Sequence, residues 1–199
     1  MRLLFDLFPC QTGSRFRGIG RYVMSLADTM ARLRGRHDMV AVANGLYPDS
    51  ADALREQLGR RLPPAHFATY THPPVGPNEG SDAAIAATLV HHAYQAMAPD
   101  VVFCSSPFEG WHEPGTPALP IGRLPSALRV GVLYDLIPCV YPEHYLNVPV
   151  VKAWYERRLE ALKEFDLLLA ISDATRDDAI RILGIEPDRV VNIAGAASS

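Results

Sequence analysis

The feature that most constrains the fold is an alternation between short, continuously apolar runs and longer amphipathic segments. Runs such as DVVFCSS, RVGVLY and DLLLAIS are apolar at consecutive positions rather than at every second position. Strands that are covered by helices on both faces have this pattern, as in a parallel sheet. The alternation therefore predicts an α/β fold, a doubly wound and mostly parallel sheet with helices on both faces.

The apolar runs and the helical periodicity place the individual elements. The predicted strands are Arg2–Leu7, Met39–Asn44, His66–Tyr70, Val101–Ser105, Arg129–Tyr134, Asp166–Ile171 and Arg189–Ile193. The predicted helices are Ile19–Leu33, Ala51–Arg60, Asp82–Met97, Val150–Phe165 and Asp173–Leu183. The proline-rich stretch Ser106–Ser126 predicts a long loop. Ser172 or Asp173 suits the N-cap of the last helix, and Gly184 suits its end.

Composition narrows the function classes. The net charge of −3 gives no basic excess that would favour nucleic acid as a partner. The cysteines, Cys10, Cys104 and Cys139, are too few and too scattered for a disulfide framework, which favours a reducing cytoplasm. No stretch approaches the roughly 18 apolar residues that a membrane span requires. We expect one cytoplasmic domain over residues 1–199, with at most a peripheral contact at the inner face of the cell membrane.

The segment QTGSRFRGIGRY, Gln11–Tyr22, connects the first predicted strand to the first predicted helix and is called the glycine loop below. Its glycines would let a ligand approach the backbone, and free N–H groups at a helix start attract anions. Tight packing around a turn explains the same glycines. The spacing is neither that of a dinucleotide fingerprint nor that of a P-loop, so it supports neither NAD nor a P-loop nucleotide.

Two further stretches carry a resemblance to a known family. VLYDLIPCVYPEHYL (Val132–Leu146) is followed by LLLAISDATRDD, and together with RGIGRY they resemble the N-terminal half of family 4 (group 1) retaining glycosyltransferases. The resemblance extends from Leu3 to Ala196 and is weakest in the middle, at about residues 46–126. These enzymes have the GT-B architecture, in which two Rossmann-like domains face each other across a cleft.

The resemblance implies a function and a set of partners. The chain would be the N-terminal, acceptor-side domain of an enzyme that transfers a sugar from a nucleotide-sugar to a growing polysaccharide or a lipid-linked glycan. The C-terminal, donor-binding domain is expected to be absent from this chain, which alone would be inactive. No cofactor or metal is expected, because the nucleotide-sugar is a substrate. The alternative is a non-catalytic module that binds an anionic or phosphorylated ligand, and self-association through an exposed face also stays open.

The resemblance also assigns roles to particular residues. Those expected to face the donor diphosphate are Arg17, Gly18, Gly20 and Arg21. Tyr134 and Asp135 are the expected catalytic residues, at the sugars. In many relatives a histidine precedes this aspartate, and Tyr134 takes its place here. A tyrosine hydroxyl can donate to a sugar oxygen, and Asp135 could orient or deprotonate an acceptor hydroxyl. The structural alternative is that Asp135 caps a turn while Tyr134 packs in the core.

Other polar and aromatic residues are candidates for the acceptor. Those expected to bind it are Arg15, Phe16, Tyr141, Glu143 and His144, although Pro142 equally suits a simple rigid turn. Trp111, His112 and Glu113 could touch an acceptor, but the favoured interpretation is a loop anchor with solvated neighbours. The adjacent His91 and His92 point in different directions on a helix, which is poor spacing for a metal. The basic residues of Val150–Phe165 could bring the enzyme to an anionic membrane, but Glu156, Glu160 and Glu164 share that helix and offset the charge, so a solvated face is favoured.

Overall fold

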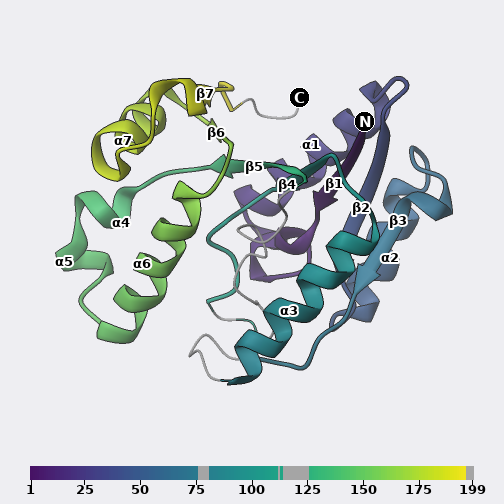
Figure 1. The fold of residues 1–199 in the computed structure, drawn as a ribbon, viewed down its shortest axis with the longest axis horizontal. Coiled ribbons are helices and arrows are strands. Elements are labelled where there is room, and N and C mark those ends of the chain that lie inside the picture. The colour runs from purple at the N-terminus through teal and green to yellow at the C-terminus, as the bar shows by residue number, and fades with distance from the viewer. Residues whose placement is uncertain (76–80, 112, 114–125, 196–199) are drawn as a thin grey trace.

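The computed structural model describes residues 1–75, 81–111, 113 and 126–195 and contains a parallel, seven-stranded sheet of order β3-β2-β1-β4-β5-β6-β7 (Figure 1). The strands are β1 (Arg2–Asp6), β2 (Asp38–Asn44), β3 (Phe67–Tyr70), β4 (Val101–Cys104), β5 (Leu128–Leu133), β6 (Leu167–Ala170) and β7 (Val190–Asn192). The predicted doubly wound α/β fold is confirmed. Each predicted strand is present, with its bounds shifted by a few residues.

Long helices connect the strands. They are α1 (Gly18–Leu33), α2 (Pro48–Leu58), α3 (Ser81–Ala96), α6 (Pro149–Lys163) and α7 (Asp173–Leu183). Between β5 and α6 lie two short helices, α4 (Ile137–Val140) and α5 (Pro142–Tyr145). Four 3₁₀ turns complete the described elements: η1 (Phe8–Cys10), η2 (Gly13–Phe16), η3 (Pro64–His66) and η5 (Pro187–Arg189). Sequence reasoning predicted neither α4 and α5 nor the 3₁₀ turns.

The consecutive apolar residues of the strands are buried on both faces of the sheet. Phe5 and Phe103 stack at 4.8 Å between ring centroids in the cluster that includes Val23 of α1 and Leu58 of α2. Residues one position away along the strands, such as Leu4, lie in a separate cluster with side chains of α3. Figure 1 views the sheet with α3 in front of it and α1 behind it. Double coverage is the physical reason for the unbroken apolar runs.

The second half of the chain has its own cluster, in which Leu162 of α6 and Ala179 of α7 pack on β5 and β6. The ends of α7 confirm the predicted caps: the Ser172 hydroxyl accepts from the Thr175 N–H at 3.1 Å, and Gly184 is left-handed with φ +67°. One expectation for α6 is corrected. The basic residues of this helix were expected on a solvated face, but Arg158 is buried, with its guanidinium 5.4 Å from the Trp154 ring centroid.

Two predictions concern, in part or in full, residues that the structure does not describe. Most of the predicted loop Ser106–Ser126 lies outside the described residues, as does His112. Within the described part of the chain, no helix has the length and apolar character that crossing a membrane would need.

Candidate functional site

A pocket of about 290 Å³ opens at the carboxyl ends of β1, β4 and β5. Its lining residues come from the connections after these strands and from α6: Gly13, Ser14, Arg17, Ile19, Ser106, Phe108, Glu109, Gly110, Trp111, Glu113, Tyr134, Asp135, Pro138 and Tyr155. In the sheet, β1 lies between β2 and β4. The strands from β1 to β3 extend the sheet in one direction, and those from β4 to β7 extend it in the other. This switch point is where open α/β sheets hold their ligands.

The walls of the pocket are aromatic and rigid. Phe108 stacks on Tyr155 with 4.8 Å between ring centroids, and Trp111 meets the Trp154 ring edge-on at 5.5 Å. Tyr134 packs in the same way against Tyr22 of α1 at 5.9 Å. Because each lining ring is held by another ring, the walls present fixed apolar surfaces, which suit the flat face of a sugar ring.

Carboxylates outnumber the basic groups in this pocket. Glu109, Glu113 and Asp135 line it, against Arg17 as the basic lining side chain. Glu109 is only 8% exposed, and burial raises the pKa of its carboxyl. Hydrogen bonds from the Ser14, Thr12 and Ser106 side chains work in the opposite direction. The interior therefore favours groups that donate hydrogen bonds, such as sugar hydroxyls, over anions.

A further carboxyl group, that of Asp6, lies at the carboxyl end of β1. Burial raises the pKa of Asp6 to about 7, and the charge of Glu109 adds to the rise, while the Phe8 N–H, which donates to Asp6 at 3.0 Å, lowers it. Asp6 and Glu109 thus share one electrostatic environment at the switch point. With its pKa at about 7, Asp6 makes this edge of the sheet sensitive to pH near neutrality.

The glycine loop folds back on the helix that follows it. A side chain at Gly20 would lie 2.5 Å from both the Arg15 Cα and the Ser14 carbonyl oxygen, so η2 rests directly on the first turn of α1. Gly20 is buried, and tight packing accounts for it. Gly18 is exposed and has open space around it. Of the two glycines predicted at the diphosphate, only Gly18 is open to a ligand.

The start of α1 is suited to an anion. Its N-cap is Arg17, which makes no side-chain capping bond. The first N–H groups of a helix have no partner within the helix and carry a partial positive charge. Arg17 and Ile19 both line the pocket, so this helix end lies at its rim. The anion-binding prediction for Arg17 and Gly18 is compatible with this geometry and stays a prediction.

Tyr134 and Asp135 both reach the pocket, but they differ in what they can do. The Tyr134 hydroxyl donates to the Ser105 carbonyl at 3.1 Å, and burial raises the pKa of this phenol, so its proton is already committed. Tyr134 can still accept a hydrogen bond. Asp135 is exposed, and its Oδ1 accepts from the Ile137 N–H at 3.0 Å, which caps α4. Its Oδ2 is the atom suited to a ligand.

Several residues predicted to bind the acceptor, and Arg21, predicted at the donor diphosphate, do not line this pocket. Phe16 is 76% exposed with the Arg15 guanidinium 4.4 Å above its ring, and Arg21 is exposed on α1. Others lie on or beside α5, exposed to solvent: Tyr141, Glu143 and His144. Glu143 and His144 contact each other at 3.4 Å. Trp111 and Glu113, for which the sequence favoured a loop anchor with a solvated neighbour, do line the pocket.

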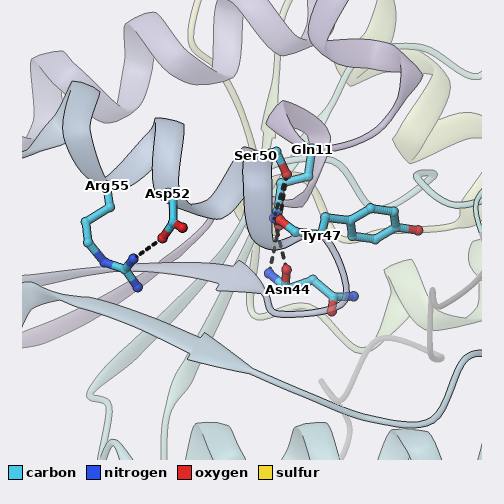
Figure 2. Close-up of polar contacts among 6 residues, drawn as sticks. All are labelled: Gln11, Asn44, Tyr47, Ser50, Asp52 and Arg55. Carbon is cyan, nitrogen blue, oxygen red and sulfur yellow. Dashed lines mark hydrogen bonds and ion pairs between the residues drawn. The ribbon is translucent and has the colours of Figure 1, made fainter.

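A buried glutamine holds the glycine loop to the neighbouring strand (Figure 2). The Gln11 amide accepts from the Asn44 N–H at 2.7 Å and donates to the Asn44 carbonyl at 3.0 Å and to the Ser50 hydroxyl at 3.2 Å. Gln11 thereby joins the end of β2 and the start of α2 to the first connection. Because its amide is hydrogen-bonded within the protein, Gln11 has a structural role rather than a ligand-binding one.

Sequence reasoning missed Asp6, Ser106, Phe108, Glu109 and Tyr155 as site residues. A usable signal existed for two of them. Asp6 interrupts an apolar strand at its carboxyl end, and Glu109 follows closely on the buried run DVVFC. Charged residues at such strand ends face the ligand side of a parallel sheet. In the part of the chain that the structure describes, no group of His, Cys, Asp and Glu side chains is arranged to hold a metal ion.

A known protein family matches most of the chain. Residues 17–195 match the model of the glycosyl transferase 4-like domain. The chain belongs to this family. The match begins at Arg17, where the glycine loop enters α1, and it includes β5 with Tyr134 and Asp135. The resemblance seen in the sequence is thus confirmed.

Curated relatives agree with the family, and a solved structure shares the fold. The chain is 31% identical over 205 residues, 98% of its length, to a serotype-specific mannosyltransferase WbdA of Escherichia coli. Another protein of that name and organism matches at 35% identity over 100 residues. The chain spans 24% of the first relative and 12% of the second. The Anabaena protein Alr3699/HepE, solved with UDP and glucose, shares the fold at a TM-score of 0.54 and 19% identity, over all of this chain and 45% of that one.

The packing of η2 on α1 predicts opposite outcomes for two nearby glycines. Gly20→Ala should destabilise the chain by about 1–3 kcal/mol, because backbone atoms cannot move aside for the new methyl group. Gly18→Ala should leave stability unchanged or raise it by about 0.5–1 kcal/mol, because alanine favours a helix. Urea unfolding of both variants measures the difference. Equal stabilities would contradict this packing.

The raised pKa of Asp6 predicts a pH-dependent stability. Between the ordinary value of 3.8 and about 7, the native carboxyl holds a proton that the unfolded chain has lost. The resulting stabilisation is complete below 3.8, declines as the pH rises to about 7 and is then absent. Asp6→Asn, which cannot titrate, should remove this decline and be more stable than the wild type at pH 8, by at most about 4 kcal/mol. Urea unfolding of both proteins from pH 4 to 8 checks this, and parallel curves would contradict it.

Proposed function

We propose that this chain is the acceptor-binding domain of a retaining glycosyltransferase, which transfers a sugar from a nucleotide-sugar to a hydroxyl of a growing polysaccharide or lipid-linked glycan. One observation carries the proposal: an aromatic pocket rich in carboxylates lies directly beside the open N-terminus of α1. A transferase needs these two environments next to each other, one for a neutral acceptor and one for a charged leaving group.

The pocket supports the acceptor side of this proposal. A saccharide offers hydroxyl donors to Glu109, Glu113 and Asp135 and an apolar ring face to Trp111. Asp135 is the group best placed to orient the attacking hydroxyl, since its carboxylate is exposed at the rim. Tyr134 shapes the pocket and can accept a hydrogen bond there.

The start of α1 supports the donor side. The unpaired amides near Gly18 and the Arg17 guanidinium would stabilise the negative charge that develops on the diphosphate as the sugar leaves. Because that charge is greatest in the transition state, these groups would lower the barrier rather than merely bind the nucleotide. In this scheme Arg17 and the start of α1 offset the diphosphate charge, and we propose no metal or cofactor.

The same helix start would also suit the alternative, a non-catalytic module for a phosphorylated ligand. The pocket argues against that alternative as the whole function, because its carboxylates repel an anion from the space beside the helix. A phosphorylated ligand would use the rim and leave the pocket without a role. We therefore favour the transferase.

Several parts of the proposal concern the larger protein. A second Rossmann-like domain would hold the nucleotide, which is in keeping with the greater length of the mannosyltransferases that the chain resembles. Their names make mannose the first sugar to test. We also propose a peripheral contact with the inner face of the cell membrane, where lipid-linked acceptors reside. Exposed apolar side chains of α4 and α5 would serve this contact, among them Ile137, Val140 and Tyr145.

Asp135→Asn tests the catalytic assignment. Asparagine keeps the oxygen that caps α4 but lacks the charge that orients and deprotonates a hydroxyl. In a protein that joins this chain to its donor-binding domain, we expect sugar transfer to fall by about 100-fold or more. The assay follows transfer of labelled sugar from a panel of nucleotide-sugars, GDP-mannose among them, to mannose oligosaccharides.

The matched control is Glu160→Gln, which removes a charge from the exposed face of α6 away from the pocket. It should leave the rate unchanged. Glu143→Gln separates the pocket from α5 as the acceptor site. Full activity of Asp135→Asn together with a large loss in Glu143→Gln would contradict the assignment.

A further inference from the structure

We infer that Glu109 is a positioning residue that holds the glycine loop in the conformation in which the N-terminus of α1 meets the diphosphate. The inference rests on the proposed function for the identity of that anion. It concerns a residue that lines the acceptor pocket but acts, through Thr12, on the neighbouring anion site.

The contact between Glu109 and Thr12 sets the direction of one hydroxyl group. The Thr12 hydroxyl donates to Glu109 Oε2 at 2.9 Å, and its oxygen accepts from the Ser14 N–H at 3.1 Å, which caps η2. A weaker acceptor, the Pro9 carbonyl, lies 3.4 Å from the same hydroxyl. The charged partner is closer and stronger, so it determines where the proton points. The lone pair is then left facing the Ser14 amide.

Burial stabilises the hydrogen bond between Thr12 and Glu109. Thr12 is 2% exposed and Glu109 is 8% exposed, so water competes poorly for either group. Removing the carboxylate would leave a buried hydroxyl without its best partner, and the cap of η2 would loosen with it. Because η2 rests on α1 through Gly20, a change in η2 reaches the first turn of α1 directly.

A second glutamate of the connection after β4, Glu113, makes a similar contact with Gly13, the residue after Thr12. Glu113 Oε1 accepts from the Gly13 N–H at 2.9 Å. Two successive residues of the glycine loop are therefore held by two carboxylates that follow β4. The loop lies between these carboxylates on one side and α1 on the other, and this fixes the position of Arg17 and Gly18.

The charge of Glu109 provides a way to separate positioning from simple electrostatics. A carboxylate near an anion site repels the anion, so deleting it should tighten anion binding if charge were its only effect. Positioning predicts the reverse, because a loosened loop binds more weakly. Glutamine keeps an oxygen that can accept from Thr12 but has no charge. Leucine removes both the charge and the acceptor.

The test uses inorganic pyrophosphate as the probe and the amide NMR signals of Gly18, Ile19 and Gly20 as the readout, in the 199-residue chain. Pyrophosphate should shift these signals in the wild type. Glu109→Leu should weaken the apparent affinity by about tenfold, the effect of one hydrogen bond to a charged group. Glu109→Gln should bind as tightly as the wild type or more tightly.

A second pair of variants approaches the same bond from its other end and serves if Glu109→Leu fails to fold. Thr12→Val has the same shape but no hydroxyl and should weaken pyrophosphate binding, whereas Thr12→Ser should restore it. Amide hydrogen exchange at Ser14, which needs no ligand, should be faster in Thr12→Val and Glu109→Leu than in the wild type. Melting curves of each variant report global stability.

The outcomes separate the two proposals. If Glu109→Leu or Thr12→Val binds pyrophosphate as tightly as the wild type, the inference is overturned and the proposed function stands. If the wild type shows no shifts at the start of α1, the diphosphate site itself is overturned, and both proposals fall. Weaker binding in both variants, with recovery in Glu109→Gln and Thr12→Ser, establishes the positioning role.

Discussion

The structure depends on the burial of a parallel sheet on both faces. Helices cover the two faces, so Phe5 and Leu4, neighbours in β1, lie in separate apolar clusters. A sheet closed in this way has no face on which to bind a ligand. Its open surfaces are the ends of the strands and the connections that leave them. Chemistry is thereby confined to one edge, and the pocket at the ends of β1, β4 and β5 follows from this confinement.

That edge of the sheet contains carboxyl groups whose burial costs free energy. Asp6 and Glu109 are carboxyls in a poorly hydrated region; the charge of Glu109 raises the pKa of Asp6, and the charge of Glu113 raises the pKa of Glu109. Glu109 is offset by the hydroxyls of Thr12 and Ser106, the first at 2.9 Å and the second at 3.4 Å. The pocket thus contains preorganised hydrogen-bond acceptors whose cost is borne by the fold. Preorganisation of this kind favours a ligand that supplies donors over one that supplies charge.

The sequence predicted the sheet well because continuous apolar runs have few explanations other than strands covered on both sides. It predicted the site less well, and the reason differs from residue to residue. Gly18 and Gly20 look equivalent in the sequence, but only the backbone of Ser14 and Arg15, which lies against Gly20, distinguishes packing from exposure. Tyr134 was assigned to chemistry, and its partner, the Ser105 carbonyl, belongs to another strand end. Glu109 was missed because its importance comes from Thr12, 97 positions away.

The division of charge along the pocket explains how one domain could serve two unlike substrates. Glu109 and Glu113, from the connection after β4, line the interior, whereas the positive end of α1 and Arg17 lie at the rim, as does Asp135. Interleaved, these charges would cancel, and neither a neutral sugar nor a phosphate would be preferred. Separated as they are, they would create a gradient that draws a diphosphate to the rim and leaves the interior to hydroxyl groups, as the proposed function requires. The bond to be formed would then lie on the boundary between the two regions, next to the exposed carboxylate of Asp135.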